Sequence, residues 1–270
     1  MAIHSSAIIE NGARLGEHVE IGPFCFVGHD AVLHERVHLV SHVSITGHTE
    51  IGARTTVHPQ AALGGEGQIR NNDFAEGRLS VGKDCVIREG VTLNVGSRAG
   101  RGITHIGDRC YFMAYSHVGH DCQVGDDVTF ANGATLGGHV QVGDGVILGG
   151  LCAVQQHGRV GKGAMIGGIT GVNRDVIPYG MAFGDHVELA GLNLIGLERR
   201  KLGKATINAM RAAFRDIFLR DGGAIAERAR AARVSWPDVA EIGEIVEFIL
   251  ADAHQPLCTA RRDRIVSVKP

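Results

Sequence analysis

Large apolar side chains, nearly all of them aliphatic, recur at every sixth position along most of this chain. An α-helix places apolar residues three and four apart and a half-buried strand places them two apart, so neither produces a strict period of six. A short strand, a tight corner and another short strand do produce it. The three runs are Ile3, Ile9, Leu15, Ile21, Val27, Leu33, Leu39, Ile45, Ile51, Val57 and Leu63; then Val81, Ile87 and Leu93; then Ile106, Phe112, Val118, Val124, Phe130, Leu136, Val142, Leu148, Val154, Val160, Ile166 and Val172.

This period predicts a mainly β protein, a parallel β-helix of hexapeptide repeats. Three hexads make one triangular coil whose aliphatic side chains point inward. Successive coils pair as parallel strands ~4.8 Å apart, and each coil buries its faces only on its neighbours.

Two segments interrupt the repeat. Residues 64–80 replace regular hexads, yet Leu63 and Val81 are one coil length apart, so we expect this segment to span one coil. Residues 94–105 shift the phase by a single position. Both segments are polar and rich in glycine, and we expect them to loop outward, as segments that carry function on a rigid scaffold often do.

The repeat is expected to stop near residues 176–178, because Pro178 cannot continue the strand pairing. Helical spacing then predicts helices over 204–220 and 223–233, and a third helix opening at 235–237. We therefore divide the chain into a β-helix domain at 1–190 and a C-terminal α-helical domain at 191–270 that covers the last coil.

Composition narrows the possible functions. The net charge of −2 offers no general attraction to nucleic acid, and no stretch approaches the ~18 apolar residues of a membrane span. The six cysteines show no metal-ligand spacing, which favours free, buried thiols. We expect a cytoplasmic protein with no transmembrane segment and no nucleic-acid partner.

The segment from Met113 to Cys122 carries the most informative chemistry. His120 stands at a corner immediately before Asp121, and Gly138 and Gln156 follow at intervals of one and two coils, so all three stack on one edge. His139 and His157 form a second stacked line. A histidine can deprotonate an attacking hydroxyl, a carboxylate can orient that histidine, and a glycine N–H can stabilise an oxyanion. These are the parts that acyl transfer requires.

Two other classes of function stay open at this stage. The chain contains 15 histidines, and most corner histidines only face solvent. A metalloenzyme of the γ-carbonic-anhydrase type would need three imidazoles that converge on zinc, and no other feature supports it. A non-catalytic binder of sugar nucleotides is the third possibility.

Longer motifs resemble the UDP-N-acetylglucosamine O-acyltransferases of lipid A biosynthesis. They are IGPFCFVG (21–28), SHVSITGHTEIG (41–52), SHVGHDCQVGD (116–126), ANGATLGGHVQVGD (131–144) and LNLIGLERR (192–200). The resemblance implies left-handed coils, a homotrimer, and transfer of a 3-hydroxyacyl group from acyl carrier protein to the sugar 3-hydroxyl. No cofactor or metal is implied beyond the phosphopantetheine thioester of the donor.

The same resemblance implies roles for individual residues. His120 matches the general base, Asp121 its orienting partner and Gly138 the oxyanion donor. The residues that match substrate-binding positions are Gln68, His117, His139, Gln156, His186, Asn193 and Arg199. The region that measures acyl length is matched by Met165 and Gly168, and also by His186.

Some positions depart from the family pattern, and all of them concern substrate contacts. Ile69, Asn71, Asn94, Gln155 and Ile195 replace an acidic residue, a lysine, two histidines and a glutamate. A paralogue with another hydroxyl or amine acceptor is therefore an alternative, and the acyl length stays open. The basic residues Arg199, Arg200, Lys201, Arg261, Arg262 and Arg264 are candidates for docking the acidic carrier protein.

Overall fold

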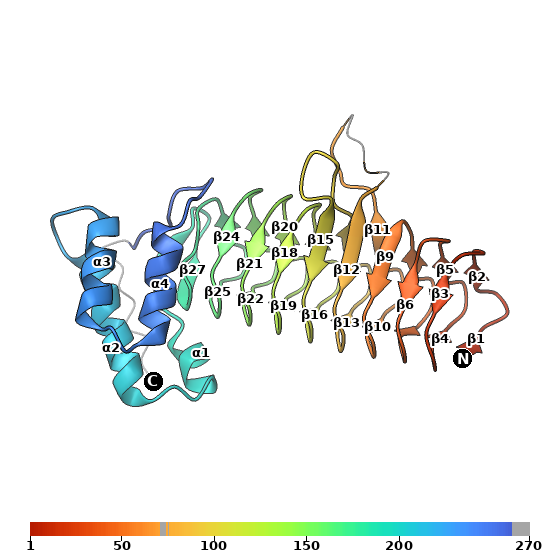
Figure 1. Ribbon diagram of the computed structural model, residues 1–270, viewed down its shortest axis with the longest axis horizontal. Helices are drawn as coiled ribbons and strands as arrows, with labels where there is room; N and C mark the ends of the chain where they lie inside the picture. Colours follow the sequence, from red (N-terminus) through yellow and green to blue (C-terminus); the bar gives the residue numbers. More distant parts are fainter. Residues whose placement is uncertain (71–73, 75, 261–270) are drawn as a thin grey trace.

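Each coil of the repeat contributes one short strand to each of three parallel sheets (Figure 1). The computed structural model describes residues 1–70, 74 and 76–260. Its sheets are the walls of a triangular prism, which is the parallel β-helix that the repeat predicts, with the left-handed coiling that the family resemblance implies. We call the walls sheet A, sheet B and sheet C, and we name each edge of the prism after the two walls that meet there.

The chain visits the three sheets in turn. Sheet A contains β1 (Ala2–Ile3), β4 (Glu20–Ile21), β7 (His38–Leu39), β10 (Thr56–Val57), β13 (Val86–Ile87), β16 (Tyr111–Phe112), β19 (Thr129–Phe130), β22 (Ile147–Leu148), β25 (Met165–Ile166), β27 (Gly180–Phe183) and β28 (Glu188–Leu192). Sheet B contains β2 (Ile8–Ile9), β5 (Phe26–Val27), β8 (Ser44–Ile45), β11 (Ala62–Gly65), β14 (Thr92–Asn94), β17 (His117–Val118), β20 (Thr135–Leu136), β23 (Ala153–Val154) and β26 (Gly171–Val172). Sheet C contains β3 (Arg14–Leu15), β6 (Val32–Leu33), β9 (His48–Ile51), β12 (Arg78–Val81), β15 (Ile103–Ile106), β18 (Gln123–Val124), β21 (Gln141–Val142) and β24 (Arg159–Val160).

The periodic aliphatic residues fill the inside of the prism. In most two-residue strands the second residue is buried, and the rings of Phe112 and Phe130 stack with centroids 4.4 Å apart. The six cysteines are free and buried, as expected from their spacing. Ile3 is an exception to the inward rule, because it is 44% exposed at the open N-terminal end, where no earlier coil covers it.

The first interruption leaves the prism, as predicted, and does not form the additional coil that its length matches. Leu63 pairs with Ile45, three hexads earlier, but with Leu93, five hexads later. Two hexads' length of chain therefore leaves the prism between β11 and β12, and the phase survives only because the excess is a whole number of hexads. The second interruption lies between β14 and β15. There the offset from Leu93 to its partner Val118 is four hexads and one further position, and this loop also projects outward (Figure 1).

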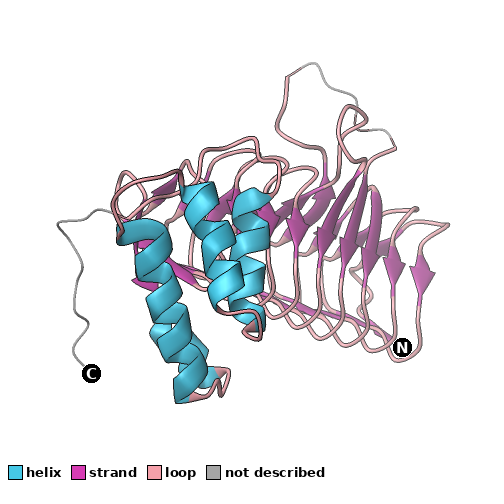
Figure 2. Ribbon diagram, turned by 60° about the vertical axis from the view of Figure 1, so that its left-hand side comes forward, coloured by secondary structure: helices cyan, strands magenta, loops and turns pink. Residues whose placement is uncertain are grey.

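The repeat continues slightly further than predicted. Beyond Pro178, β27 adds to sheet A in parallel with β25, and β28 then pairs with β27 in an antiparallel hairpin. The predicted domain boundary after residue 190 falls inside β28. Helices cover this end of the prism (Figure 2): α1 (Leu194–Arg199), α2 (Lys204–Phe214), α3 (Ile225–Ser235) and α4 (Ala240–Leu250). None of the helices in the described part of the chain has the length and apolar content needed to span a bilayer.

The helix over 204–220 is not one regular α-helix. It changes after Phe214 into a short π-helix, η1 (Arg215–Leu219), and Arg228 of α3 donates from Nε to the carbonyl of Ile217 at 2.8 Å. That contact satisfies a carbonyl at the helix end without a regular cap. The other two helices begin later than predicted, at Ile225 and Ala240.

Candidate active site

The turns between sheet B and sheet C bring the candidate catalytic residues together. His120 and Asp121 lie between β17 and β18, and Gly138 and His139 occupy the same turn one coil later. Gln156 continues the line between β23 and β24. Both outward loops, 66–77 and 95–102, leave the prism from this same B–C edge (Figure 1). The edge therefore combines stacked reactive side chains with loops that partly enclose them.

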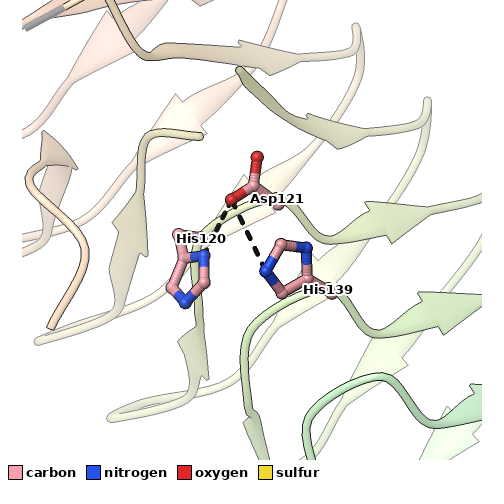
Figure 3. A group of neighbouring side chains, drawn as sticks. All are labelled: His120, Asp121 and His139. Atoms are coloured by element: carbon pink, nitrogen blue, oxygen red, sulfur yellow. Dashed lines mark hydrogen bonds and ion pairs between the residues drawn. The ribbon is translucent and has the colours of Figure 1, made fainter. Parts of the chain in front are cut away.

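His120 and Asp121 form a buried hydrogen-bonded pair (Figure 3). The Nδ1 atom of His120 lies 2.8 Å from Oδ2 of Asp121, and Asp121 is completely buried. With a proton on Nδ1, the lone pair of Nε2 is free to accept a proton from a substrate. Phe74 lies beside the imidazole, with ring centroids 6.1 Å apart and the ring planes at 64°, so an aromatic side chain shields His120.

Four donors converge on the Asp121 carboxylate. Besides His120, the backbone N–H and the hydroxyl of Ser97 donate to Oδ2 at 3.0 and 2.7 Å, and the Gly102 N–H donates to Oδ1 at 3.0 Å. Burial disfavours the charged form, but the hydrogen bonds from His120 and Ser97 outweigh it and hold the pKa of Asp121 below its usual value. The carboxylate thus stays ionised at neutral pH.

Gly138 lies directly against the imidazole of His120. A Cβ atom at this position would stand 2.3 Å from Nε2, closer than any real contact, so only glycine fits. Within the described part of the chain, the Gly138 N–H donates to no acceptor. A glycine N–H without an acceptor, in a turn packed against an imidazole, is a candidate oxyanion donor.

Further imidazoles continue along the B–C edge. His139 meets His120 edge-on, with centroids 4.8 Å apart, and it stacks on His157 at 4.5 Å with ring planes 6° apart. His254, from the segment after α4, lies 4.9 Å from His157. Burial lowers the pKa of His139, and the neighbouring basic groups of His157, His120 and Arg101 lower it further against the opposing effect of Asp121. His139 is consequently neutral near pH 7.

Three side chains at this edge lie as close together as metal ligands do. Ligand atoms of His120, Asp121 and His139 all lie within 4.8 Å of one another. However, Asp121 already accepts four hydrogen bonds, and one of the two His120 ring nitrogens is committed to it. The arrangement therefore fits an oriented general base better than an open set of metal ligands.

Known proteins resemble this chain in sequence and in fold. A family profile described as "Udp N-acetylglucosamine O-acyltransferase; Domain 2" matches residues 175–258, and the bacterial transferase hexapeptide profile (six repeats) matches residues 103–138. A relative from Rhizobium johnstonii, named acyl-[acyl-carrier-protein]–UDP-N-acetylglucosamine O-acyltransferase, is 45% identical over 96% of this chain and 95% of its own. The chain belongs to the UDP-N-acetylglucosamine O-acyltransferase family.

Other relatives agree with this assignment. An acyltransferase of the same name from Brucella ovis is 46% identical over 97% of this chain and 94% of its own. The structure of UDP-N-acetylglucosamine acyltransferase from Campylobacter jejuni superposes with a TM-score of 0.90 at 34% identity, and covers 96% of this chain and all of that one. The resemblance in fold and sequence therefore extends over both the prism and the helices.

The remaining predicted substrate residues do not all lie on the B–C edge. His117 projects outward from sheet B, where Oγ1 of Thr92 lies 2.7 Å from its Nδ1 and burial lowers its pKa. Gln68 is exposed in the first outward loop, and His186 is exposed in the turn between β27 and β28. Gln156 is exposed one coil beyond Gly138.

Other members of this family set lie on different edges of the prism. Met165 is on sheet A, and Gly168 is exposed on the A–B edge, away from His120. Asn193 caps α1 by accepting from Gly196 N–H and donates to the Gly163 carbonyl, both at 3.0 Å. Arg199 is exposed at the end of α1. A single chain therefore does not gather all of these residues around one point.

The altered family positions are also spread over the molecule. Asn94 donates its amide to the carbonyls of Gly65 and Glu66, while its buried Oδ1 has no partner among the described residues. Ile69 and Ile195 present exposed apolar side chains, and Gln155 is exposed. Asn71 lies outside the described residues.

Sequence reasoning missed two groups at this edge. Ser97 and Gly102, which hold Asp121, belong to the second interruption, where no six-residue period indicates which residue turns inward. His254 is distant from His157 in the chain, so only the docking of the C-terminal segment reveals the contact.

Proposed function

We propose that this protein transfers an acyl group, in the family a 3-hydroxyacyl group, from acyl carrier protein to the 3-hydroxyl of UDP-N-acetylglucosamine. The observation that carries the proposal is the His120 imidazole, which is held by ionised Asp121 and packed against Gly138, whose N–H donates to no acceptor among the described residues. The names of the relatives supply the two substrates, and the geometry of the B–C edge suits their reaction.

In the proposed reaction His120 acts through Nε2. It removes the proton from the sugar hydroxyl as the oxygen attacks the thioester carbonyl, and the carbonyl oxygen becomes an oxyanion beside the Gly138 N–H. Collapse of the tetrahedral intermediate breaks the C–S bond, and the imidazolium returns its proton to the departing thiolate. Asp121 keeps Nδ1 protonated and stabilises the imidazolium, so no cofactor beyond the phosphopantetheine thioester of the donor is needed.

We further propose that the protein is a homotrimer whose sites lie between neighbouring chains. Tyr115, Leu151 and Ile169 stand one or two coils apart on the A–B edge, and they are 71%, 68% and 76% exposed. All three have positive φ, which is uncommon for a β-branched residue such as Ile169. An exposed apolar line on a regular edge suits burial against another chain.

A second copy would also complete the site. Gly168 lies on that same A–B edge, and His120 lies on the B–C edge of the same prism. Packing the A–B edge of one copy near the B–C edge of the next would bring the acyl-length region to the base. A cyclic trimer repeats this contact three times and is closed, so that no copy of either contact surface stays unpaired.

Carrier-protein docking and cellular location are part of the same proposal. Arg199, Arg200 and Lys201 are exposed together at the end of α1 and offer positive charge to an acidic carrier protein. Arg261, Arg262 and Arg264, the other basic candidates, lie outside the described residues. Six free thiols suit a reducing compartment, and we propose a cytoplasmic location with no nucleic-acid partner.

Turnover of purified protein tests the proposed function. With a 3-hydroxyacyl carrier protein and UDP-N-acetylglucosamine, mass spectrometry should detect the 3-O-acylated nucleotide sugar, and a chelator should leave the rate unchanged. His120→Ala should lower kcat at least ~100-fold, the scale of lost general-base catalysis, without changing the elution volume of the assembly. Wild-type protein that turns over no acyl donor, or a His120→Ala variant with near-normal kcat, would overturn the proposal.

A further inference from the structure

The second outward loop, residues 95–102, closes over the Asp121 carboxylate. Ser97 is 1% exposed and gives two hydrogen bonds to Oδ2, the same oxygen that lies 2.8 Å from His120 Nδ1. A Cβ on Gly100 would stand 2.4 Å from that oxygen, so the loop backbone packs on the carboxylate and leaves no room for water. The other carboxylate oxygen, Oδ1, accepts a hydrogen bond from the Gly102 N–H. The backbone of Asp121 is fixed as well, because its N–H donates to Thr104 Oγ1 at 2.8 Å.

We propose that Ser97 is a positioning residue for the acyl transfer. Its hydroxyl fixes the rotation of the Asp121 carboxylate toward His120, and this orientation influences the rate. This inference rests on the proposed function of the site. It assigns to the 95–102 loop a role in the chemistry, beyond enclosing the B–C edge.

The hydroxyl of Ser97 is the part of this network that a side-chain substitution can remove. Its backbone N–H and that of Gly102 would persist in most variants, so Asp121 would remain buried and partly satisfied. Without the 2.7 Å hydroxyl contact, Oδ2 can rotate away from the line to His120 Nδ1. The imidazole would then lose its preferred orientation, and fewer encounters would place Nε2 correctly.

The protonation of the pair should change in a defined direction. The Ser97 hydrogen bonds contribute to the lowered pKa of Asp121, after the hydrogen bond from His120. Loss of the hydroxyl therefore raises the pKa of Asp121. Because the ionised carboxylate is the form that orients Nδ1 of His120, the acid limb of the kcat/KM profile should move to higher pH.

The experiment compares Ser97→Ala with Ser97→Thr, which keeps a hydroxyl, and with Thr55→Val as a matched control. Thr55 is also fully buried and donates to the Gly82 carbonyl at 2.9 Å, but it lies on the C–A edge, away from the site. In Ser97→Ala, kcat should fall ~10-fold to 100-fold, the range for one hydrogen bond to a charged group, with KM within about threefold. The acid limb should move to higher pH, Ser97→Thr should restore most of kcat, and Thr55→Val should match wild type in both.

A double-mutant cycle with Asp121→Asn separates positioning from general damage. If Ser97 acts through Asp121, adding Ser97→Ala to Asp121→Asn should change kcat by less than about twofold. A Ser97→Ala enzyme with wild-type kcat and pH profile, or fully additive losses in the cycle, would overturn this inference. Absence of activity in wild-type protein would instead overturn the proposed function, so the two failures are distinguishable.

Discussion

Gly138→Ala offers a direct test of the site, because it changes geometry and leaves the donor in place. Alanine keeps the backbone N–H that we assign to the oxyanion. Its methyl group would stand 2.3 Å from Nε2, 2.4 Å from Cε1 and 3.0 Å from Cδ2 of His120. Carbon atoms in contact prefer separations of ~3.5–4.0 Å, so the imidazole would have to retreat by roughly 1 Å.

The imidazole has little room to retreat. Asp121 holds Nδ1 on one side, and a Cβ on Gly67 would stand 2.9 Å from the Cβ of His120, so the first loop packs closely there. A displacement of ~1 Å at a catalytic group costs about 100-fold in rate, which corresponds to ~2.7 kcal/mol in the activation barrier. Overpacking should also lower the free energy of unfolding by about 1–3 kcal/mol.

Steady-state kinetics and urea unfolding would measure both effects. Gly203→Ala is the control, since a Cβ at that glycine meets no atom within 4 Å and its activity should equal that of wild type. We expect Gly138→Ala to retain its assembly state and lose most of kcat. A folded Gly138→Ala enzyme with kcat within about threefold of wild type would refute the close packing of this glycine on a catalytic His120.

Two further predictions concern assembly and the acceptor. Ile169→Glu places a charge on the apolar A–B edge, so light scattering should give a mass below that of three chains. Because the proposed site needs a neighbouring chain, kcat should fall as the trimer dissociates. An active Ile169→Glu trimer would contradict the proposed interface. Ile69 cannot accept a hydrogen bond from a sugar hydroxyl, and a buried hydroxyl without a partner costs ~1–3 kcal/mol. Calorimetry should therefore show that wild-type protein binds UDP-N-acetylglucosamine more weakly than the Ile69→Asp variant does. Tighter binding by wild type, or equal binding by both, would show that the loop at 64–80 makes other contacts, and the 3-amino analogue is the comparison ligand for an amine acceptor.

The repeat could be predicted from the sequence because every coil packs the same positions of its hexads into the core. An inward aliphatic residue at each sixth position determines strand, corner and register at once, and the stacking of Gly138 on His120 follows from a spacing of one coil. Where the period fails, the reasoning fails with it. The length of residues 64–80 matched one coil by coincidence, and only the pairing of Leu63 with Leu93 shows that two hexads' length of chain leaves the wall.

The parts of the site that depend on irregular segments could not be predicted. Ser97 reaches Asp121 because its loop folds back over the edge, and such a path depends on backbone hydrogen bonds that residue type does not specify. The contact of His254 with His157 requires the C-terminal segment to return along the prism, where Asp175 N–H donates to the Pro256 carbonyl at 2.9 Å and Cys258 N–H to the Asp175 carbonyl at 2.8 Å.

The two outward loops have a consequence for how this protein can diverge. Both leave and rejoin the wall at one edge, and the strands on either side resume parallel pairing despite the extra length of chain between them. Lengthening a flexible loop is inexpensive, about 0.6 kcal/mol for each doubling, whereas a change within a coil disturbs its neighbours above and below. Insertions and exchanges in the first loop can therefore alter which acceptor is recognised while the stack of coils, the second loop and the His120–Asp121 pair stay unchanged. In this solenoid, new specificity can be acquired beside that pair without a new core.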